Sequence, residues 1–251
     1  MDRLNQSRIA KVLSLIQQKQ LRALVMGGQA CVFYGAAEFS RDIDLALDLN
    51  PQDLRLLQEL LVELQAECIA VPRFDTAALQ AGHAVHFRCH APGTEGLRID
   101  VMHSMRGVEP FETLWNRRTT LETEGLTIDL MSLPDLVQAK KTQRDKDWPM
   151  IRRLIEADYH FRHVEASDAQ WRFWLLEART PDLLVELAKS RSQLCASLIG
   201  QRPLLHSALC GDFTEVESQL EAEEHRERML DREYWLPLKK ELERMRHTRQ
   251  P

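Results

Sequence analysis

The most constraining stretch of the chain is residues 42–47, which have the sequence Asp-Ile-Asp-Leu-Ala-Leu. Polar and apolar side chains begin there by alternating with the period of two that is typical of a β-strand with one buried face. The pattern predicts a strand with its large apolar residues facing the core. Asp42 and Asp44 then share the other face, about 7 Å apart because each residue rises about 3.3 Å. The alternative is that they simply form the polar outer face of an antiparallel sheet.

A glycine pair precedes this strand. Residues 21–26 form a short apolar run that ends at Gly27-Gly28, and residues 29–34 begin a helical pattern. We therefore expect a strand, a tight turn and a helix. Backbone N–H groups at such a turn, together with the helix dipole, can hold phosphate oxygens. A plain turn without a ligand is the other interpretation of the glycine pair.

A second alternating stretch supplies another acidic residue. Residues 97–103 predict a strand in which Asp100 lies on the outward face, where it can share a side with Asp42 and Asp44. Magnesium prefers hard oxygen ligands and retains waters and substrate phosphates. We therefore expect the protein to supply two or three aspartate ligands, from adjacent strands, to a magnesium ion.

The rest of the chain predicts an α+β fold. With 251 residues there is enough chain for one large or two modest domains. We expect a mixed β-sheet flanked by helices over residues 1–160, followed by a helical C-terminal domain over residues 161–251. Further elements are expected as a helix before the first strand, a helix from Pro51, a strand at 84–89, a hairpin at 118–131 and a helix at 132–142.

Composition excludes several classes of protein. No apolar run approaches the roughly 20 residues of a bilayer span, and the first twenty residues lack the apolar core of a secretory signal, so we expect a cytoplasmic protein without membrane contact. Five scattered cysteines without a CxxC pair favour reduced core residues over disulfides or a zinc ribbon. The net charge of −5 argues against a surface that coats polyanions, although six basic residues against two acidic ones at 140–153 indicate a local anion-facing surface.

The order and spacing of these motifs resemble the nucleotidyltransferase superfamily with the DNA polymerase β-like catalytic core. The resemblance covers about residues 20–158. Within the superfamily the chain is most similar to the bacterial branch that contains the AbiEii-type toxins and uncharacterised relatives. That branch has a Leu-Ile-x-x-Lys motif followed by Arg-x-x-Asp. The matching motifs here are Met26-Gly27-Gly28, Asp42-Ile43-Asp44-Leu45, Ile99-Asp100-Val101, Leu136-Val137-Gln138-Ala139-Lys140 and Arg144-Asp145-Lys146-Asp147.

Two positions depart from the branch. Relatives often have an arginine four positions before the first aspartate, where this chain has Glu38 and keeps only the small hydroxyl of Ser40. Relatives also often have one more residue between the lysine and the arginine. Lys141 is therefore an alternative to Lys140.

The resemblance implies a metal-dependent nucleotidyltransferase. A hydroxyl would attack the α-phosphate of a nucleoside triphosphate, and pyrophosphate would leave. Mg²⁺ or Mn²⁺ would be held by Asp42, Asp44 and Asp100, in the two-metal arrangement expected of in-line displacement. Lys140 would place a charge on the triphosphate, and Asp147 would orient that lysine or the nucleotide. Expected nucleotide-binding residues are Gly27, Gly28, Ser40, Arg41, Lys141 and Arg144.

The partners beyond the nucleotide are left open. The acceptor is either a small-molecule hydroxyl or an RNA end, and the C-terminal helices offer a surface for a protein partner. The alternative function is a degenerate member of the fold that binds nucleotide or a protein without turnover.

Other candidate sites are better explained by packing. His83, His86 and His90 with Cys89 suggest a transition-metal cluster, but strand alternation puts His83 and His86 on opposite faces. We therefore expect ordinary hydrogen-bonded histidines. Trp171 and Trp174 lie on a helical pattern and are expected in the core rather than as a base-stacking platform.

Overall fold

The computed structural model describes residues 2–123 and 125–247, with side chains from residue 8 onward. The chain forms two compact units. The first contains the chain up to Phe33, Ala37–Ala139 and the chain from Tyr234 onward, and the second contains Tyr34–Ala36 and Lys140–Glu233. Whether residues 1–160 and 161–251 fold as separate domains stays a prediction.

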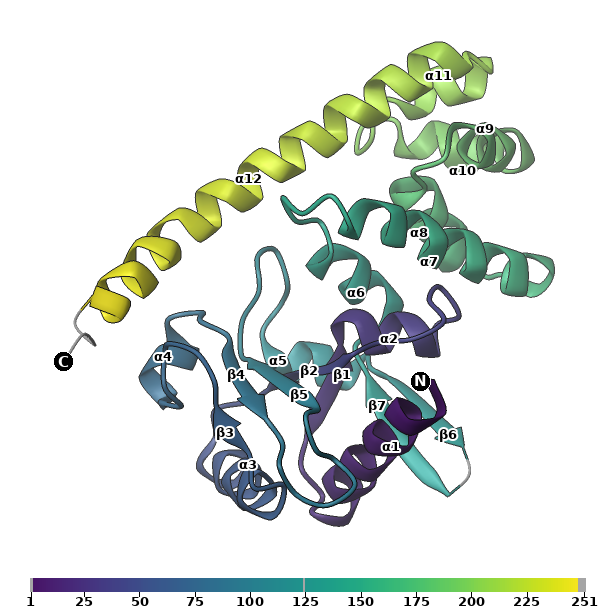
Figure 1. Cartoon of the computed structure of the whole chain (residues 1–251). Coiled ribbons are helices and arrows are strands. Elements are labelled where there is room, and N and C mark those ends of the chain that lie inside the picture. Colours follow the sequence, from purple (N-terminus) through teal and green to yellow (C-terminus); the bar gives the residue numbers. More distant parts are fainter. Residues whose placement is uncertain (1, 124, 248–251) are drawn as a thin grey trace. The chain divides into compact units, whose positions relative to one another are not determined.

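The first unit is built on a mixed sheet of seven strands within the described residues, in the order β3-β4-β5-β2-β1-β7-β6 (Figure 1). The central strands β5-β2 and β1-β7 pair in parallel, and all other neighbours are antiparallel. The strands are β1 (Ala23–Met26), β2 (Asp42–Leu47), β3 (Glu67–Cys68), β4 (Val85–Arg88), β5 (Arg98–Met102), β6 (Thr119–Thr123) and β7 (Leu126–Leu130).

Alternation along β2 and β5 decides which side chains enter the core. Ile43 and Leu45 on β2 are fully buried, as are Ile99 and Val101 on β5. The residues between them face the other side of the sheet, as the period of two requires. The predicted strand at 42–47 is confirmed with the same bounds.

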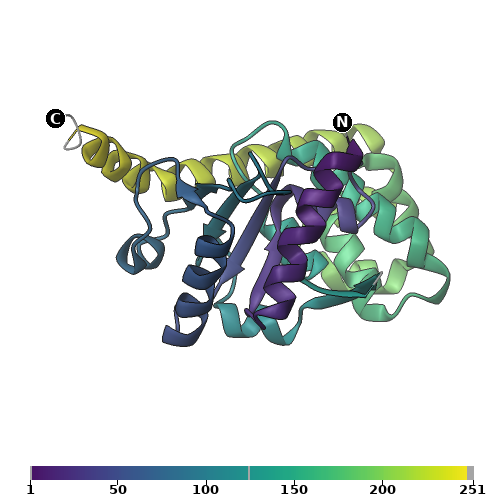
Figure 2. The same cartoon turned by 60° about the horizontal axis from the view of Figure 1, so that its bottom comes forward.

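Helices of the first unit cover the sheet, and the start of α3 shows how a capping residue and a proline set where a helix begins. Figure 2 shows α1 and α3 running across one face of the sheet, and Lys19 and Glu63 join the ends of these helices by an ion pair of 2.7 Å. The Asn50 side chain caps α3 by accepting a hydrogen bond from the Asp53 N–H, with Pro51 as the first helical residue. These helices are α1 (Asp2–Gln18), α2 (Gly27–Phe33), α3 (Pro51–Glu63), α4 (Thr76–Gln80), α5 (Phe111–Asn116) and α6 (Leu133–Ala139).

The second unit is helical, and its tryptophans lie in the core as expected, with Trp171 7% and Trp174 0% exposed. Arg202 is buried there and donates to the Glu223 carboxylate and to the carbonyls of Leu175 and Ala178. The last helix, α12, contains Pro237 and has residues in both units. The elements are α7 (Asp147–Arg162), the 3₁₀ helix η1 (His163–Glu165), α8 (Asp168–Glu177), α9 (Pro181–Ser190), α10 (Ser192–Leu198), α11 (Leu205–Cys210) and α12 (Phe213–His247).

The architecture confirms the expected α+β class, with a mixed sheet, flanking helices and a helical C-terminal region. The two-residue strand β3 was not expected, because Glu67-Cys68 is too short to show a period. No helix in the described part of the chain is both long enough and apolar enough to cross a membrane.

Candidate active site

The register of the sheet brings Asp44 and Asp100 side by side. In the parallel pair β2-β5, Asp44 lies opposite Asp100 and Asp42 lies opposite Arg98. Neighbouring strands are about 4.8 Å apart, and residues opposite each other point to the same face. Three carboxylates from two distant stretches of sequence therefore share one face of the sheet.

The glycine bend is packed against this carboxylate face. Gly27 has a φ of +63°, and a Cβ on it would lie 1.8 Å from Asp44 Oδ2. The Gly28 N–H donates a hydrogen bond of 3.3 Å to the same oxygen, and a Cβ on Gly28 would lie 2.8 Å from Ser40 Oγ. Only glycine allows the backbone this close to Asp44, so the glycine pair has a packing reason beyond ending a strand.

Ser40 connects the loop before β2 to the first aspartate. Its buried hydroxyl lies 3.0 Å from the Asp42 carbonyl oxygen and 3.1 Å from Asp42 Oδ1, and it can donate to either. Arg41 and Glu38 are exposed. The residue that takes the place of the relatives' arginine thus lies at the surface.

Asp100 is held by two basic side chains. Arg98 NH2 donates to Asp100 Oδ2 at 2.8 Å and to Oδ1 at 3.2 Å, and His86 Nδ1 lies 2.9 Å from Oδ1. Burial of Asp100 favours its neutral form, but the contacts with His86 and Arg98 outweigh burial and lower the pKa of Asp100. The carboxylate is therefore ionised at neutral pH.

Arg98 is affected by all three aspartates. Partial burial disfavours its charged form, but the charge of Asp100, the hydrogen bond with Asp100 and the charges of Asp42 and Asp44 outweigh burial and raise the pKa of Arg98. Its side chain is 42% exposed, against 11% for Asp100. The guanidinium is a permanent positive charge beside the carboxylate face.

The donor set fits a hard divalent cation. Asp42, Asp44 and Asp100 offer carboxylate oxygens, the ligands that Mg²⁺ and Mn²⁺ accept, on adjacent strands of one face. No group of three His, Cys, Asp or Glu side chains among the described residues is gathered closely enough to hold a metal as it stands. In this structure the Asp100 carboxylate accepts hydrogen bonds from Arg98.

The predicted lysine and its aspartate form an ion pair in the second unit. Lys140 Nζ lies 3.4 Å from Asp147 Oδ1, and both side chains are buried. Thr142 Oγ1 and Arg144 Nε both donate to Asp147 Oδ2, at 2.6 and 2.7 Å. Burial raises the pKa of Asp147, but the charge of Lys140, the Thr142 hydrogen bond and Arg144 outweigh it and lower that pKa. Lys141 instead pairs with Glu177 at 2.8 Å.

The basic stretch at 140–153 differs from the expected anion-facing surface. Lys140, Lys141 and Arg144 are engaged by the carboxylates just described, and Arg152 lies 3.7 Å from Glu224. The acidic partners Glu177 and Glu224 come from residues that are far away in sequence. A charge count within the stretch therefore overstates the local positive charge.

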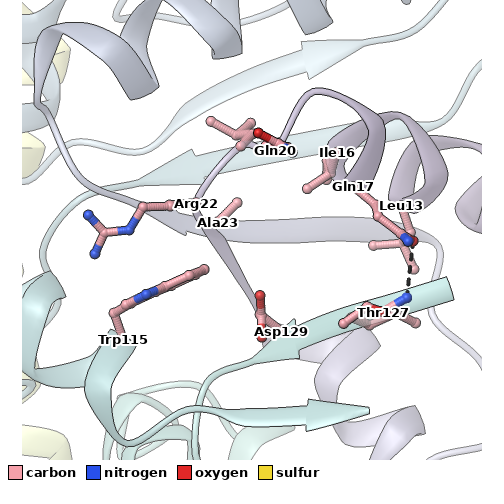
Figure 3. Close-up of a pocket in the computed structure, with 11 residues that line it drawn as sticks. Leu13, Ile16, Gln17, Gln20, Arg22, Ala23, Trp115, Thr127 and Asp129 are labelled. Atoms are coloured by element: carbon pink, nitrogen blue, oxygen red, sulfur yellow. Dashed lines mark hydrogen bonds between the residues drawn. The ribbon is translucent and has the colours of Figure 1, made fainter. Parts of the chain in front are cut away.

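A pocket of about 230 Å³ lies at the start of β1, whereas Asp44 lies opposite Met26 at the end of that strand. Figure 3 shows Arg22 and Trp115 on one side of the pocket and a hydrogen bond between Gln17 and Thr127 on the other. The Arg22 guanidinium lies over the Trp115 ring, 4.9 Å from its centroid, and pairs with Glu112. The polar lining of the pocket is thus largely satisfied internally.

Sequence patterns indicated His86 only as a member of the histidine group explained by packing, and they did not predict that Arg98 or His86 contacts Asp100. Alternation along residues 97–103 puts Arg98 on the face of Asp100, two residues away, so a signal for Arg98 was present. His86 lies opposite Asp100 across the antiparallel pair β4-β5, which no local pattern reveals. His83 is buried and pairs with Glu241 at 2.9 Å instead. The four His and Cys residues therefore do not form one cluster.

Comparison with known proteins finds a likeness in fold alone. No family model matches the chain, and a comparison with curated proteins finds no match. The fold is similar to a solved structure described as an antigenic nucleotidyltransferase-like protein from Paracoccidioides brasiliensis, with a TM-score of 0.42 and 18% sequence identity, covering 82% of this chain and 93% of that one. A likeness at that TM-score indicates nothing about activity, so a function has to be inferred from the site residues themselves.

Proposed function

We propose that the chain is a metal-dependent nucleotidyltransferase that transfers a nucleoside monophosphate from a nucleoside triphosphate to a hydroxyl group. The observation that carries this proposal is the packing of the Gly27-Gly28 bend against Asp44, with Asp100 opposite Asp44 on the next strand. A glycine bend, two aspartates on one strand and a third on its neighbour form a site with backbone donors and carboxylates for a metal–phosphate complex.

We assign different roles to the carboxylates. Asp42 and Asp44 would hold the metal, and Asp100 would contribute on the side of the attacking hydroxyl. A Mg²⁺ or Mn²⁺ ion held by these aspartates would lower the pKa of that hydroxyl and would neutralise charge on the leaving pyrophosphate. The acceptor hydroxyl would lose its proton to solvent, and the bond from its oxygen to the α-phosphorus would form as the bond to pyrophosphate breaks. Ser40 keeps Asp42 in position through its hydroxyl.

Lys140 and Asp147 are the residues that support the closer likeness to the AbiEii-type branch. Their ion pair fits a lysine oriented by the aspartate seven residues later. Lys141 pairs with Glu177 instead, and we assign the phosphate-facing role to Lys140 because its partner is the aspartate of the Arg-x-x-Asp motif. The acceptor class, a small molecule or an RNA end, is decided by a labelling assay.

That assay uses each labelled nucleoside triphosphate with Mg²⁺ and either total RNA or a small-molecule extract. We expect label transfer that requires the metal and is lost in Asp44→Asn. Asp48→Asn is the matched control, since Asp48 lies just past β2 and bonds to Leu49 and Asn50. Transfer by Asp44→Asn at the wild-type rate would exclude this site.

A second candidate function is nucleotide binding without turnover. The observation in its favour is the engagement of Asp100 by Arg98 and His86, which leaves two aspartates for the metal. In that case the wild type would bind triphosphate in the presence of Mg²⁺, and no acceptor would be labelled. The same assay, with equilibrium dialysis of the nucleotide, separates the two functions.

A further inference from the structure

The position of Arg98 suggests a role that the proposed function does not contain. The side chain projects from β5 two residues before Asp100, on the same face, and its own register partner on β2 is Asp42. It therefore stands next to both the first and the third carboxylate. Two hydrogen bonds fix its guanidinium on Asp100.

Like charges on one face of a sheet repel each other and favour a compensating cation. The three aspartates place three negative charges on that face, and Arg98 places one positive charge there. Because the guanidinium stays protonated at any physiological pH, this compensation is permanent. A divalent cation that uses Asp100 must displace Arg98 from both carboxylate oxygens, or displace His86 as well where it binds Oδ1.

We propose that Arg98 is an internal counter-cation that competes with the divalent metal for Asp100, and so weakens metal binding by the nucleotide-free protein. The inference rests on the proposed function, because it takes Asp42, Asp44 and Asp100 as the metal ligands. Arg98 acts through Asp100 and is a positioning residue. Its two hydrogen bonds keep the carboxylate oriented in the absence of the metal.

The exposure of Arg98 makes the competition reversible. With 42% of its side chain in solvent, the guanidinium can move from the carboxylate into water rather than into the core. The Asp100 side chain is only 11% exposed, so a neutral residue at position 98 is expected to lower stability as well, and the unfolding of each variant is measured beside its metal binding.

The test measures Mn²⁺ binding to the nucleotide-free protein by calorimetry and by the electron paramagnetic resonance of free Mn²⁺. Arg98→Gln should tighten binding about tenfold, the effect of removing a unit charge about 6 Å from a divalent ion in water. Arg98→Met serves as a second neutral variant. Arg98→Lys keeps the charge and should bind within about twofold of the wild type.

Arg88→Gln is the matched control. Arg88 is exposed and lies opposite Arg98 on β4, one strand further from the aspartate pair, so the same loss of charge should change Mn²⁺ affinity by at most about twofold because of screening. Unchanged or weaker Mn²⁺ binding by both neutral variants would overturn the proposal. So would a gain in Arg98→Lys equal to that in Arg98→Gln, because charge would then not be the cause.

Asp44→Asn separates this inference from the proposed function. Loss of Mn²⁺ binding in Asp44→Asn, with no gain in the neutral Arg98 variants, would remove the role of Arg98 and leave the metal site standing. Full Mn²⁺ affinity in Asp44→Asn would instead remove the metal site itself, and the role of Arg98 with it.

Discussion

At Gly27 the backbone has a φ of +63°, and the space that a side chain would need is occupied by the Asp44 carboxylate. Any other residue at this position would therefore be destabilising for two reasons. The left-handed backbone conformation would cost about 1–2 kcal/mol, and the side chain would have to displace the Asp44 carboxylate. The residue that directly follows β1 therefore restricts the position of a proposed metal ligand.

Gly27→Ala is expected to lower the free energy of unfolding by about 3 kcal/mol, combining backbone strain with overpacking, and to abolish Mn²⁺ binding. Chemical denaturation and calorimetry measure the two effects. Gly96→Ala is the control, since Gly96 has a φ of +79° with no atom within 4 Å of its Cβ position. It should show the backbone cost alone. Equal effects of the two variants on Mn²⁺ binding would contradict the packing argument.

At the scale of elements, the start of α7 is organised around Asp147. This residue is the first of the helix, where a negative charge is favourable for the helix dipole. Its carboxylate accepts hydrogen bonds from Lys140, Thr142 and Arg144. Three side chains between α6 and α7 therefore converge on one buried carboxylate.

Asp147→Asn is expected to destabilise the protein by about 3 kcal/mol at pH 7, because Lys140 would be left buried without its counter-charge. The folded-state pKa of Asp147 lies below its ordinary value of 3.8. Its contribution is therefore fully present well above pH 3.8 and is lost as the pH falls through the folded-state pKa. Urea unfolding at pH 7 and at stepwise lower pH should show the difference between wild type and variant shrinking in acid.

Asp145→Asn is the matched control for that series. Asp145 lies in the same segment and pairs with Arg228, but its side chain is 97% exposed. An exposed pair contributes less than about 1 kcal/mol. If Asp145→Asn lowered the free energy of unfolding as much as Asp147→Asn does, burial would not be the reason that the Lys140–Asp147 pair stabilises the protein.

At the scale of the whole molecule, charge is compensated over long sequence distances. The net charge is −5, and the basic stretch at 140–153 finds acidic partners at Glu177 and Glu224. A surface that binds long polyanions needs uncompensated positive charge. We therefore expect an extended nucleic acid to bind more weakly than the number of basic residues at 140–153 suggests.

We expect weak binding of long RNA, with a Kd no tighter than about 10⁻⁵ M at 0.15 M salt, within the range of nonspecific binding. Fluorescence anisotropy of a labelled single strand at several salt concentrations measures it. Submicromolar affinity with a steep salt dependence would contradict this expectation and would favour an RNA acceptor.

Local patterns in the sequence determined much of the candidate site. Alternation gave β2 and β5 and the face of each aspartate, and the glycine pair marked the end of β1, because these features depend on neighbouring residues only. The same alternation contained Arg98, although its pairing with Asp100 was not foreseen. The roles of Asp42, Asp44, Asp100, Lys140 and Asp147 stay predictions until they are measured.

Only the tertiary structure decided what depends on register and on distant partners. The pairing of β2 with β5 put Asp44 opposite Asp100, the antiparallel β4 brought His86 to the same carboxylate, and Glu177 and Glu224 neutralised charges that the sequence displayed as a basic surface. Hydrogen bonds between strands and ion pairs across a fold join residues by position in space. The period of a sequence pattern shows which face of its own strand or helix a residue lies on, but not which distant residue it contacts.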